Sequence, residues 1–343
     1  MEMICEKEYG YLMEKEVTSY LKACCHSGDV LAAAEKHCRK TKKIRERKST
    51  KAPRKLHIQW YLTENPKGVI VISHGFTEAA QKYEELIYYF LKAGYHVYMP
   101  EHMGHGLSYR LTDDPSLIYV DSWERYVRDF LKICHGIKKT YPDFHLNLFA
   151  HSMGGGIGAS AAAWEPELFH KIILSSPMIR PLTGNVPWPL AVMAAWGMCI
   201  LGKGKAYVAG QKPYDNSETF ETSAGSSKAR FERYNAFRQN QKELQTCAAS
   251  YGWLFAAAKM SWYLRIFGWK KLTAPVLFLQ AEKDDFVSVH TLQKFAEKIR
   301  RKGKAPCEYV SFAATRHEIY SSDDITMKKY MERILNFLGE KSV

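Results

Sequence analysis

The feature that most constrains this chain is an apolar run at residues 146–150 that leads directly into a glycine-rich serine turn. The segment reads Leu-Asn-Leu-Phe-Ala-His-Ser-Met-Gly-Gly-Gly, with Ser152 at the turn between Ala150 and Gly154. On a strand–turn–helix of this kind the serine hydroxyl projects above the sheet, and its neighbours must be small because strand and helix cross closely. The start of the following helix also favours developing negative charge. The pattern predicts that Ser152 is a nucleophile; the alternative is a serine in a glycine-rich packing turn.

Short apolar runs alternate with helical stretches on both sides of Ser152. This alternation predicts an α/β fold, with a mostly parallel central sheet and helices on both faces. Two runs read Val-Ile-Val-Ile-Ser and Val-Leu-Phe-Leu-Gln, and continuous apolar runs are typical of buried parallel strands. The expected strands cover residues 56–62, 69–73, 96–100, 146–150, 171–175, 276–280 and 308–312. The expected helices cover residues 83–93, 123–139, 155–164, 289–302 and 325–338.

The same alternation divides the chain into three parts. It runs through residues 56–177 and 273–343, which form the expected α/β core. It stops over residues 178–272, which are rich in Trp, Tyr, Met and Phe and contain no clear strand, so we expect a helical cap inserted over the carboxyl edge of the sheet. Residues 1–55 are polar, and we expect them to form a helical and basic N-terminal extension.

A serine hydroxyl is a weak nucleophile and needs a base that a third group orients. On folds with a serine turn of this type, the acid and then the histidine follow the serine along the chain. Asp284 and Asp285 come just after the apolar run at 276–280, and His317 follows the run at 308–312. Both aspartates are candidates, and we prefer Asp284 as the acid and His317 as the base. The alternatives are an aspartate that caps a turn or helix and a histidine that serves packing.

Acyl transfer also needs two backbone N–H donors aimed at the oxyanion. One is expected from Met153, the residue after the nucleophile. The other is expected from Phe76, because the apolar run at 69–73 leads into His-Gly-Phe-Thr. A further glycine-rich loop at residues 101–108 lacks the lysine and the spacing of a phosphate-binding loop, and we interpret it as structural.

Much of the formal net charge of +13 is local. Between Lys36 and Lys55 there are eleven Lys or Arg residues and one acid, Glu46. Such a run usually indicates a solvated segment; close to a membrane it attracts anionic phospholipid by about 1 kcal/mol per basic residue. Nucleic acid is the least favoured partner, because no nucleic-acid-binding motif accompanies the run.

One uncharged stretch bears on the membrane question. Residues 181–202 carry no charge, but their compact apolar part runs only from Leu190 to Leu201. A spanning helix needs about 20 mostly apolar residues, so we favour a buried or interface-facing cap helix. Residues 1–20 show no secretory signal, and the eight cysteines show no metal-type spacing. We expect reduced thiols and a cytoplasmic protein, with peripheral membrane contact as an option.

Further motifs surround these candidate residues, namely HGFTEAAQKYEEL, MPEHMGHGLS, YVDSWERYVRDF, LFAHSMGGGIG, LQAEKDDFVSV and TRHEIY. Together they resemble the monoglyceride lipase and lysophospholipase branch of the α/β-hydrolases. The segments RLTDDPSLIYV and TSAGSSKARFERY, with Tyr251-Gly-Trp253, are similar in particular to bacterial lysophospholipases of the L2 type. The similarity extends over residues 55–338.

The resemblance implies an α/β-hydrolase fold whose cap forms a tunnel for an acyl chain. It also implies the roles of the nucleophile, the acid, the base and the two oxyanion donors for Ser152, Asp284, His317, Phe76 and Met153, respectively. The chain departs from the pattern at Ala150, at Ala281 and in the longer basic stretch before Leu56. None of these departures removes a catalytic group, and the last leaves the role of the N-terminal extension open.

We therefore expect a serine ester hydrolase that cleaves the acyl ester of a single-chain lipid through an acyl-enzyme intermediate. The substrate is either a lysophospholipid or a monoacylglycerol; neither metal nor organic cofactor is required, and the oligomeric state is open. A short-chain carboxylesterase or a proline-type aminopeptidase on the same fold is an alternative. The aminopeptidase would need acids in the cap to hold a substrate amine, and the cap offers Asp215, Glu218, Glu221 and Glu232. A non-catalytic binding protein is disfavoured because the triad is complete.

Overall fold

The computed structural model describes residues 3–33 and 53–339. Their centre is an eight-stranded sheet in the order β1-β2-β4-β3-β6-β7-β9-β10. From β4 to β10 all neighbouring strands are parallel, whereas β2 is antiparallel to both β1 and β4. All the strands expected from the sequence are present. Their bounds are β2 Lys55–Tyr61, β3 Gly68–Ser73, β4 Tyr95–Pro100, β6 Leu146–His151, β7 Ile172–Ser175, β9 Val276–Ala281 and β10 Cys307–Phe312.

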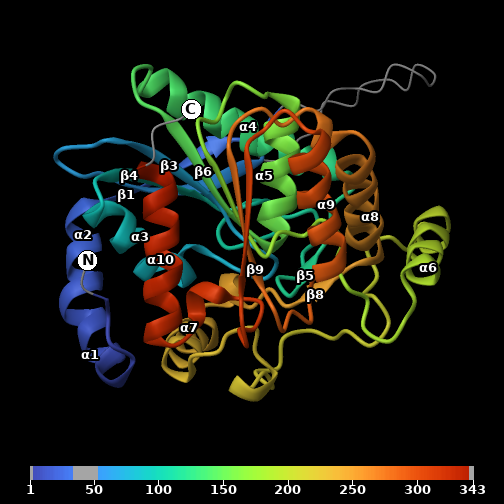
Figure 1. Ribbon diagram of the computed structural model, residues 1–343. Coiled ribbons are helices and arrows are strands. Elements are labelled where there is room, and N and C mark those ends of the chain that lie inside the picture. The colour runs from blue at the N-terminus through green and yellow to red at the C-terminus, as the bar shows by residue number, and fades with distance from the viewer. Residues whose placement is uncertain (1–2, 34–52, 340–343) are drawn as a thin grey trace.

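Helices cover both faces of this sheet (Figure 1). The helices α4 (Trp123–Thr140), α5 (Ser152–Trp164) and α9 (Val289–Lys302) pack into one apolar core. The helices α3 (Glu84–Lys92) and α10 (Asp324–Gly339) pack into the core on the opposite face. Both sides of β3, β4, β6, β7 and β9 are therefore buried, which explains their continuous apolar runs.

The N-terminal segment differs from the expected helical extension. It is helical from Glu6 to Cys24, including α1 (Tyr9–Leu12) and α2 (Ser19–Cys24), but β1 (Cys25–Leu31) then pairs with β2 at the edge of the sheet. The expectation of helix throughout was wrong at β1, because pairing with a distant strand covers the edge that β2 would otherwise expose. Apolar side chains of the segment, Ile4, Tyr9, Met13, Val17 and Leu21, are buried in the core. Most of the basic run Lys36–Lys55 lies outside the described residues.

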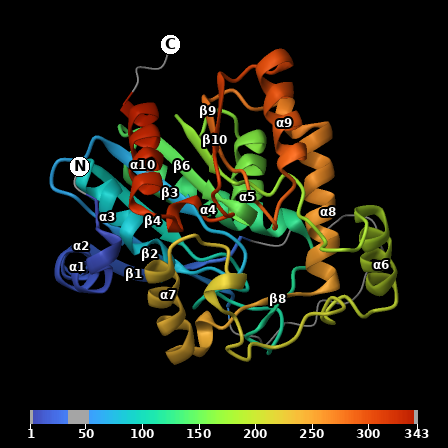
Figure 2. The same ribbon diagram turned by 60° about the horizontal axis from the view of Figure 1, so that its bottom comes forward.

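Residues 178–272 hold three helices, α6 (Trp188–Ile200), α7 (Lys228–Asn240) and α8 (Tyr251–Ile266). They also hold a short strand that the sequence did not indicate, β8 (Ala248–Ala249), which pairs with β5 (Leu117–Ile118). In Figure 2, α7, β8 and α6 lie below the sheet from left to right. The two-residue β8 is too short to show a periodicity, and it exists because the backbone of β5 lies beside it.

The helix α6 packs against α8 at the periphery of the molecule (Figure 1). It has 13 residues. Among the described residues, no helix combines the length and the apolar character that a bilayer crossing requires.

Candidate active site

Ser152 occupies the sharp turn between β6 and α5. Its φ angle is +50°, a left-handed conformation that costs a non-glycine residue energy and that the surrounding structure must impose. A Cβ atom at Gly154 would lie 2.0 Å from the carbonyl oxygen of Ser73, so only glycine allows α5 to start this close to β3. The small residues around Ser152 are therefore a steric requirement of the crossing strand and helix.

Ala150 stands where a glycine is usual in this motif, and the structure shows how its methyl group is accommodated. Ala150 is fully buried. A Cβ atom built on Gly158 would lie 3.2 Å from the Cβ of Ala150, which is tighter than ordinary contact. The absence of a side chain at Gly158 therefore provides the space that the Ala150 methyl group occupies.

The structure brings Ser152, His317 and Asp284 together at the carboxyl edge of the sheet. The Oγ of Ser152 lies 2.7 Å from Nε2 of His317, and Nδ1 of His317 lies 2.8 Å from Oδ2 of Asp284. The hydrogen bond to the carboxylate fixes the proton on Nδ1, so that Nε2 accepts the proton of the serine hydroxyl. All three side chains are buried. This is the geometry of a nucleophile, a base and an orienting acid.

The two adjacent aspartates have different surroundings in the structure. Asp284 is buried, and its Oδ1 accepts hydrogen bonds from the backbone N–H groups of Phe286 and Val287 at 3.0 and 2.9 Å. Burial opposes its ionisation, but the interaction with His317 and the two N–H donors outweigh it and lower the pKa of the Asp284 carboxyl. Asp285 is exposed. Asp284 therefore stays ionised in contact with His317, as the sequence reasoning preferred.

The two expected oxyanion donors stand on the segments that follow two neighbouring strands, β6 and β3. Met153 is the second residue of α5, where backbone N–H groups have no acceptor within the helix. Phe76 follows β3, and its N–H donates no hydrogen bond within the described part of the chain. The Phe76 ring contacts Trp253 of α8 with the ring centroids 4.3 Å apart, so the cap covers this loop.

A small apolar cavity adjoins Met153 under α8. Its lining includes Tyr126 and Met178 as well as Met153, Trp253 and Met260. The free volume is about 10 Å³, and the exposed lining is almost entirely apolar. The cavity is too small for a lipid chain as it stands, because α8 packs tightly on α4 and α5. An acyl chain that enters here must displace the flexible methionine side chains.

Glu78 is a second buried carboxylate beside the site, and the sequence reasoning did not single it out. Its Oε2 accepts hydrogen bonds from the Gly75 N–H and the Tyr83 hydroxyl, both at 2.5 Å. Its Oε1 accepts a hydrogen bond from the Tyr320 hydroxyl at 2.7 Å. Glu78 thus connects the loop of Phe76 to the loop that follows His317. The Glu in HGFTE, three residues after Gly75, was the available signal.

The charge state of Glu78 follows from its surroundings. Burial opposes ionisation, but the interactions with His151 and with the positive Lys82, together with the hydrogen bonds from the two tyrosines, lower the pKa of Glu78 to about 2. His151, which precedes Ser152, faces Glu78 with its Nε2 3.6 Å from Oε1. Burial lowers the pKa of His151 to about 3, so this imidazole is neutral at pH 7. A fixed negative charge and a neutral ring therefore lie behind the nucleophile.

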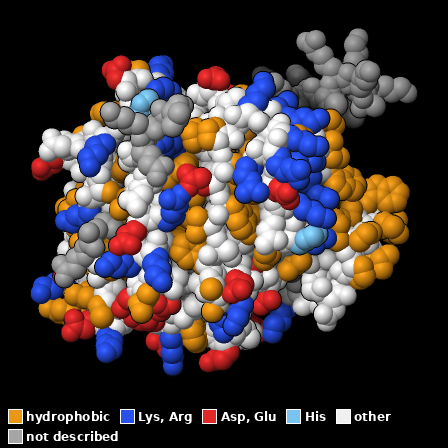
Figure 3. Space-filling model, viewed as in Figure 1, with side chains coloured by type: hydrophobic (Ala, Val, Ile, Leu, Met, Phe, Trp, Pro, Cys, Tyr) orange, Lys and Arg blue, Asp and Glu red, His pale blue; other side chains and the backbone are white. Residues whose placement is uncertain are grey.

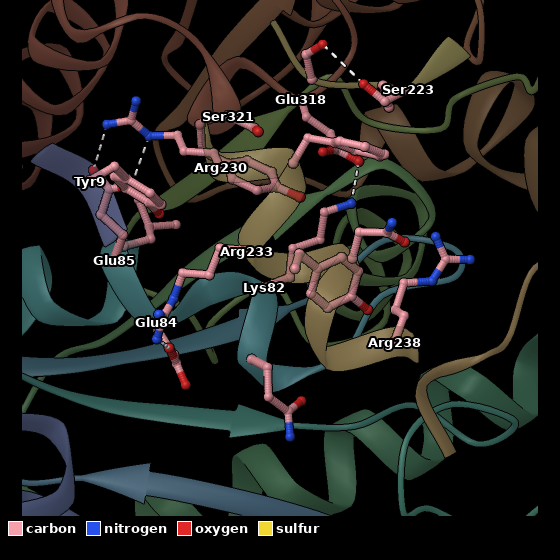
Figure 4. A pocket seen from close by; sticks show the side chains of 18 of the residues that line it. Tyr9, Lys82, Glu84, Glu85, Ser223, Arg230, Arg233, Arg238, Glu318 and Ser321 are labelled. Atoms are coloured by element: carbon pink, nitrogen blue, oxygen red, sulfur yellow. Dashed lines mark hydrogen bonds and ion pairs between the residues drawn. The ribbon is translucent and has the colours of Figure 1, made fainter. Parts of the chain in front are cut away.

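A second, polar cavity of about 50 Å³ lies between α7, α3 and the N-terminal segment (Figure 4). Its cations are already paired with carboxylates: Lys82 with Glu318, Arg230 with Glu85, Arg233 with Glu84 and Arg238 with Glu218. The charges balance, so the cavity offers no net attraction to an ionic ligand. We interpret it as the interface that holds α7 of the cap against α3.

The N-terminal segment takes part in this interface. The Arg230 guanidinium of α7 lies over the Tyr9 ring and donates a hydrogen bond to the Ile4 carbonyl oxygen. Arg233 pairs with Glu14 as well as with Glu84. The N-terminal helices therefore support the position of α7, a relation that the sequence did not reveal because the partners lie more than 200 positions apart.

Comparisons with known proteins agree with this fold. Residues 64–324 match the family model described as serine aminopeptidase, S33. The probable lysophospholipase L2 of Haemophilus influenzae is 26% identical over 275 residues, which cover 80% of this chain and 84% of that protein. The monoglyceride lipase of Rattus norvegicus is 35% identical over 120 residues, which cover 35% of this chain and 38% of that protein. These relatives confirm the branch predicted from the sequence motifs.

Solved structures confirm the fold. The carboxyl esterase of Bacillus coagulans superimposes with a TM-score of 0.71 at 17% identity, over 92% of this chain and 98% of that one. At such low identity the likeness concerns the arrangement of helices and strands alone.

Proposed function

The chain belongs to the family described as serine aminopeptidase, S33, and from this premise we propose that it is a serine hydrolase of carboxylic esters that acts on single-chain lipids. One observation carries the proposal. A hydrogen-bonded chain joins Ser152, which lies on a strained turn, to His317 and Asp284, and a small apolar cavity adjoins Met153. The relatives named lysophospholipase and monoglyceride lipase support a lipid ester as the substrate.

The geometry favours a two-step acyl transfer. His317 takes the proton of Ser152 as the Oγ attacks the ester carbonyl carbon, and Asp284 stabilises the resulting imidazolium. The N–H groups of Phe76 and Met153 receive the negative charge on the carbonyl oxygen. His317 then protonates the leaving alcohol, and a water molecule hydrolyses the acyl-enzyme by the same steps in reverse order.

The surroundings of the triad favour a substrate with an apolar tail. Apolar and aromatic side chains of α4 and α8 enclose the space next to Met153. The ring of Phe286, which is half exposed, lies 5.1 Å from the His317 ring and leaves an apolar approach from the surface. The acyl chain of a lipid would fit the buried apolar side next to Met153, and its polar head group would fit the side that is open to the surface.

Peptide hydrolysis is the alternative that the family description raises. A substrate amine would need a free carboxylate in the cap. Asp215 and Glu232 are exposed and paired with Lys212 and Lys228, and Glu218 is paired with Arg238. Glu221 is exposed. None of these carboxylates lines the apolar cavity beside Met153, and this arrangement favours esters over aminoacyl substrates.

Product analysis by mass spectrometry tests the proposal. Purified protein is incubated with a panel of lysophospholipids, monoacylglycerols, short-chain esters and aminoacyl arylamides. Release of fatty acid from a single-chain lipid at the highest kcat/KM is the expected result, and it also decides between the two lipid classes. Preference for aminoacyl arylamides, or for short-chain esters over every lipid, would contradict the proposed substrate class.

We further propose that the protein acts at the surface of a membrane with anionic lipid. The apolar helix α6 exposes Leu190, Met193, Trp196 and Ile200, each by more than half. Such a face is suited to the boundary between head groups and acyl chains. The basic run Lys36–Lys55 supplies attraction to anionic head groups.

A further inference from the structure

A groove between α8 and α9 carries a strong positive charge that the hydrolysis of an ester does not use. It has a volume of about 800 Å³, and its lining includes the cations Arg180, Arg265, Lys294 and Lys298 and the apolar residues Trp262 and Ile266. No acidic residue lines it. His290, Lys294 and Lys298 are four positions apart on α9 and therefore lie along one side of that helix.

The positive charges of this groove have no acidic partner in the part of the chain that the structure describes. In residues 3–33 and 53–339, none of Arg180, Arg265, Lys294 and Lys298 forms an ion pair. The nearby acid Glu297 is paired with Arg301 instead. Like charges four residues apart weaken a helix, so Lys294 and Lys298 destabilise α9 unless an anion compensates them.

Arg180 shows the lack of a counter-charge most directly. Its guanidinium donates one hydrogen bond, to the Ser288 Oγ at 2.9 Å, while its Nε is buried and has no partner in the described part of the chain. Burial and the nearby Arg265 lower the pKa of the Arg180 guanidinium. Two cations therefore approach each other here with a donor still unused, which is the arrangement that an anionic group would stabilise.

The groove continues directly into the exposed apolar surface of the cap. Its lining residues Trp262 and Ile266 are about half exposed, as is Phe267, which follows them. The α6 face lies next to them, because α6 packs on α8. In Figure 3, hydrophobic side chains gather over α6 at the right edge, and Lys and Arg side chains gather over α9 to its left.

We propose that this groove binds the phosphate head groups of anionic phospholipids while the adjoining α6–α8 face enters the acyl boundary. The combination decides the occupant: a cationic groove alone would suit any polyanion, but the exposed Trp and Ile side chains along its rim match a lipid surface. The inference rests on the proposed action at a membrane and adds the place and orientation of the contact. The backbone N–H of Leu182, in the segment that leads to α6, donates a hydrogen bond to the Phe286 carbonyl oxygen. Phe286, whose ring lies beside His317, is therefore close to the edge of the proposed membrane contact.

Vesicle co-sedimentation tests the groove. The full chain is mixed with vesicles of phosphatidylcholine, or of equimolar phosphatidylcholine and phosphatidylglycerol, which are diacyl lipids. The variant Arg265→Gln/Lys294→Gln/Lys298→Gln is compared with Lys22→Gln/Lys328→Gln/Lys329→Gln, which removes the same charge on the opposite side of the sheet. At about fivefold per basic residue, the groove variant should bind the anionic vesicles on the order of 100-fold more weakly, and the control should bind like the wild type.

Each outcome bears on a separate statement. Equal weakening of both variants would mean that net charge alone attracts the protein and would overturn the groove as a site. Strong binding to short DNA or to an acidic peptide, lost in the groove variant, with no preference for anionic vesicles would overturn the lipid as its occupant. Hydrolysis of a soluble short-chain ester is measured in all three proteins. It should be unchanged, and its absence from the wild type would contradict the proposed function instead.

Discussion

The Oγ of Ser152 lies 2.7 Å from Nε2 of His317, although 165 positions separate the two residues in the sequence. The strand order produces this proximity, because β6 and β10 both end at the carboxyl edge of one parallel sheet. The loops after these strands therefore meet, and the acid after β9 completes the row.

Replacement of the nucleophile is the most direct test of the site. Ser152→Ala should leave a folded protein whose kcat on a lipid ester falls by on the order of 10⁶, as for a triad serine in a protease. A fluorophosphonate probe should label the wild type and not the variant. Persistent labelling of the variant would assign the nucleophile to another residue.

The two adjacent aspartates should differ sharply. Asp284→Asn should lower kcat by about 10⁴, because the amide favours the wrong tautomer of His317. Asp285→Asn is the matched control and should have little effect, since Asp285 is exposed. A larger loss in the Asp285 variant would contradict the hydrogen bonding described for His317.

Glu78 should act through the loop that presents the Phe76 N–H. Glu78→Gln places an amide where two donors converge, so the loop should move and kcat should fall by up to about 10², the lower range for losing one oxyanion donor. Comparing a thionoester with the matching oxygen ester separates this effect from general destabilisation, because sulfur accepts hydrogen bonds from the oxyanion donors poorly. The wild type should hydrolyse the oxygen ester faster than the thionoester, and this preference should be smaller in the Glu78→Gln variant. Tyr320→Phe, which removes one hydrogen bond from the other oxygen, should reduce the preference less. A lowered melting temperature with an unchanged preference would indicate a structural role alone.

Stability should fall on the acidic side of neutrality because of His151. Its folded-state pKa of about 3 lies below the value of about 6.5 for an unfolded chain. Between these values the unfolded chain binds the extra proton, so the free energy of unfolding rises with pH by up to about 1.4 kcal/mol per unit. Burial lowers the pKa values of His74, His102 and His105 as well, which steepens the dependence.

Urea unfolding at several pH values from 5 to 7 measures how the free energy of unfolding depends on pH. This range lies above the pKa of Glu78, so that carboxyl group contributes little to the slope. His151→Gln should flatten the slope, because it removes the buried imidazole. An identical slope in the wild type and the His151 variant would contradict a neutral buried imidazole.

The basic run should strengthen membrane binding independently of catalysis. Neutral replacement of its eleven Lys and Arg residues should reduce sedimentation with anionic vesicles and leave the hydrolysis of a soluble short-chain ester intact. Raising the salt from low to several hundred millimolar should reduce wild-type binding in the same way, because the ions screen the charges. Equal sedimentation of wild type and variant would remove the run as a membrane contact. Extraction by detergent but never by salt or alkali would instead favour a spanning helix.

Local sequence determined the parts of this protein that depend on short-range chemistry. The turn at Ser152 needs small residues because strand and helix cross there, so the pattern around it is visible without the fold. Buried parallel strands such as β3 and β9 must be apolar on both sides, and their runs marked the sheet. The order of Ser152, Asp284 and His317 after three strands of the sheet then sufficed to predict the candidate site.

Only the tertiary structure decided the features that depend on partners far away in the chain. The strand β1 forms because β2 offers an unpaired edge, and β8 forms because β5 lies beside it. Glu78 gains its position from tyrosines on two different elements, and Arg230 of the cap meets Tyr9 from the N-terminal segment. The groove between α8 and α9 likewise combines Arg180, Arg265 and the row on α9, which are scattered in the sequence. Packing brings such groups together, and no local pattern of residues records which distant surface each of them will meet.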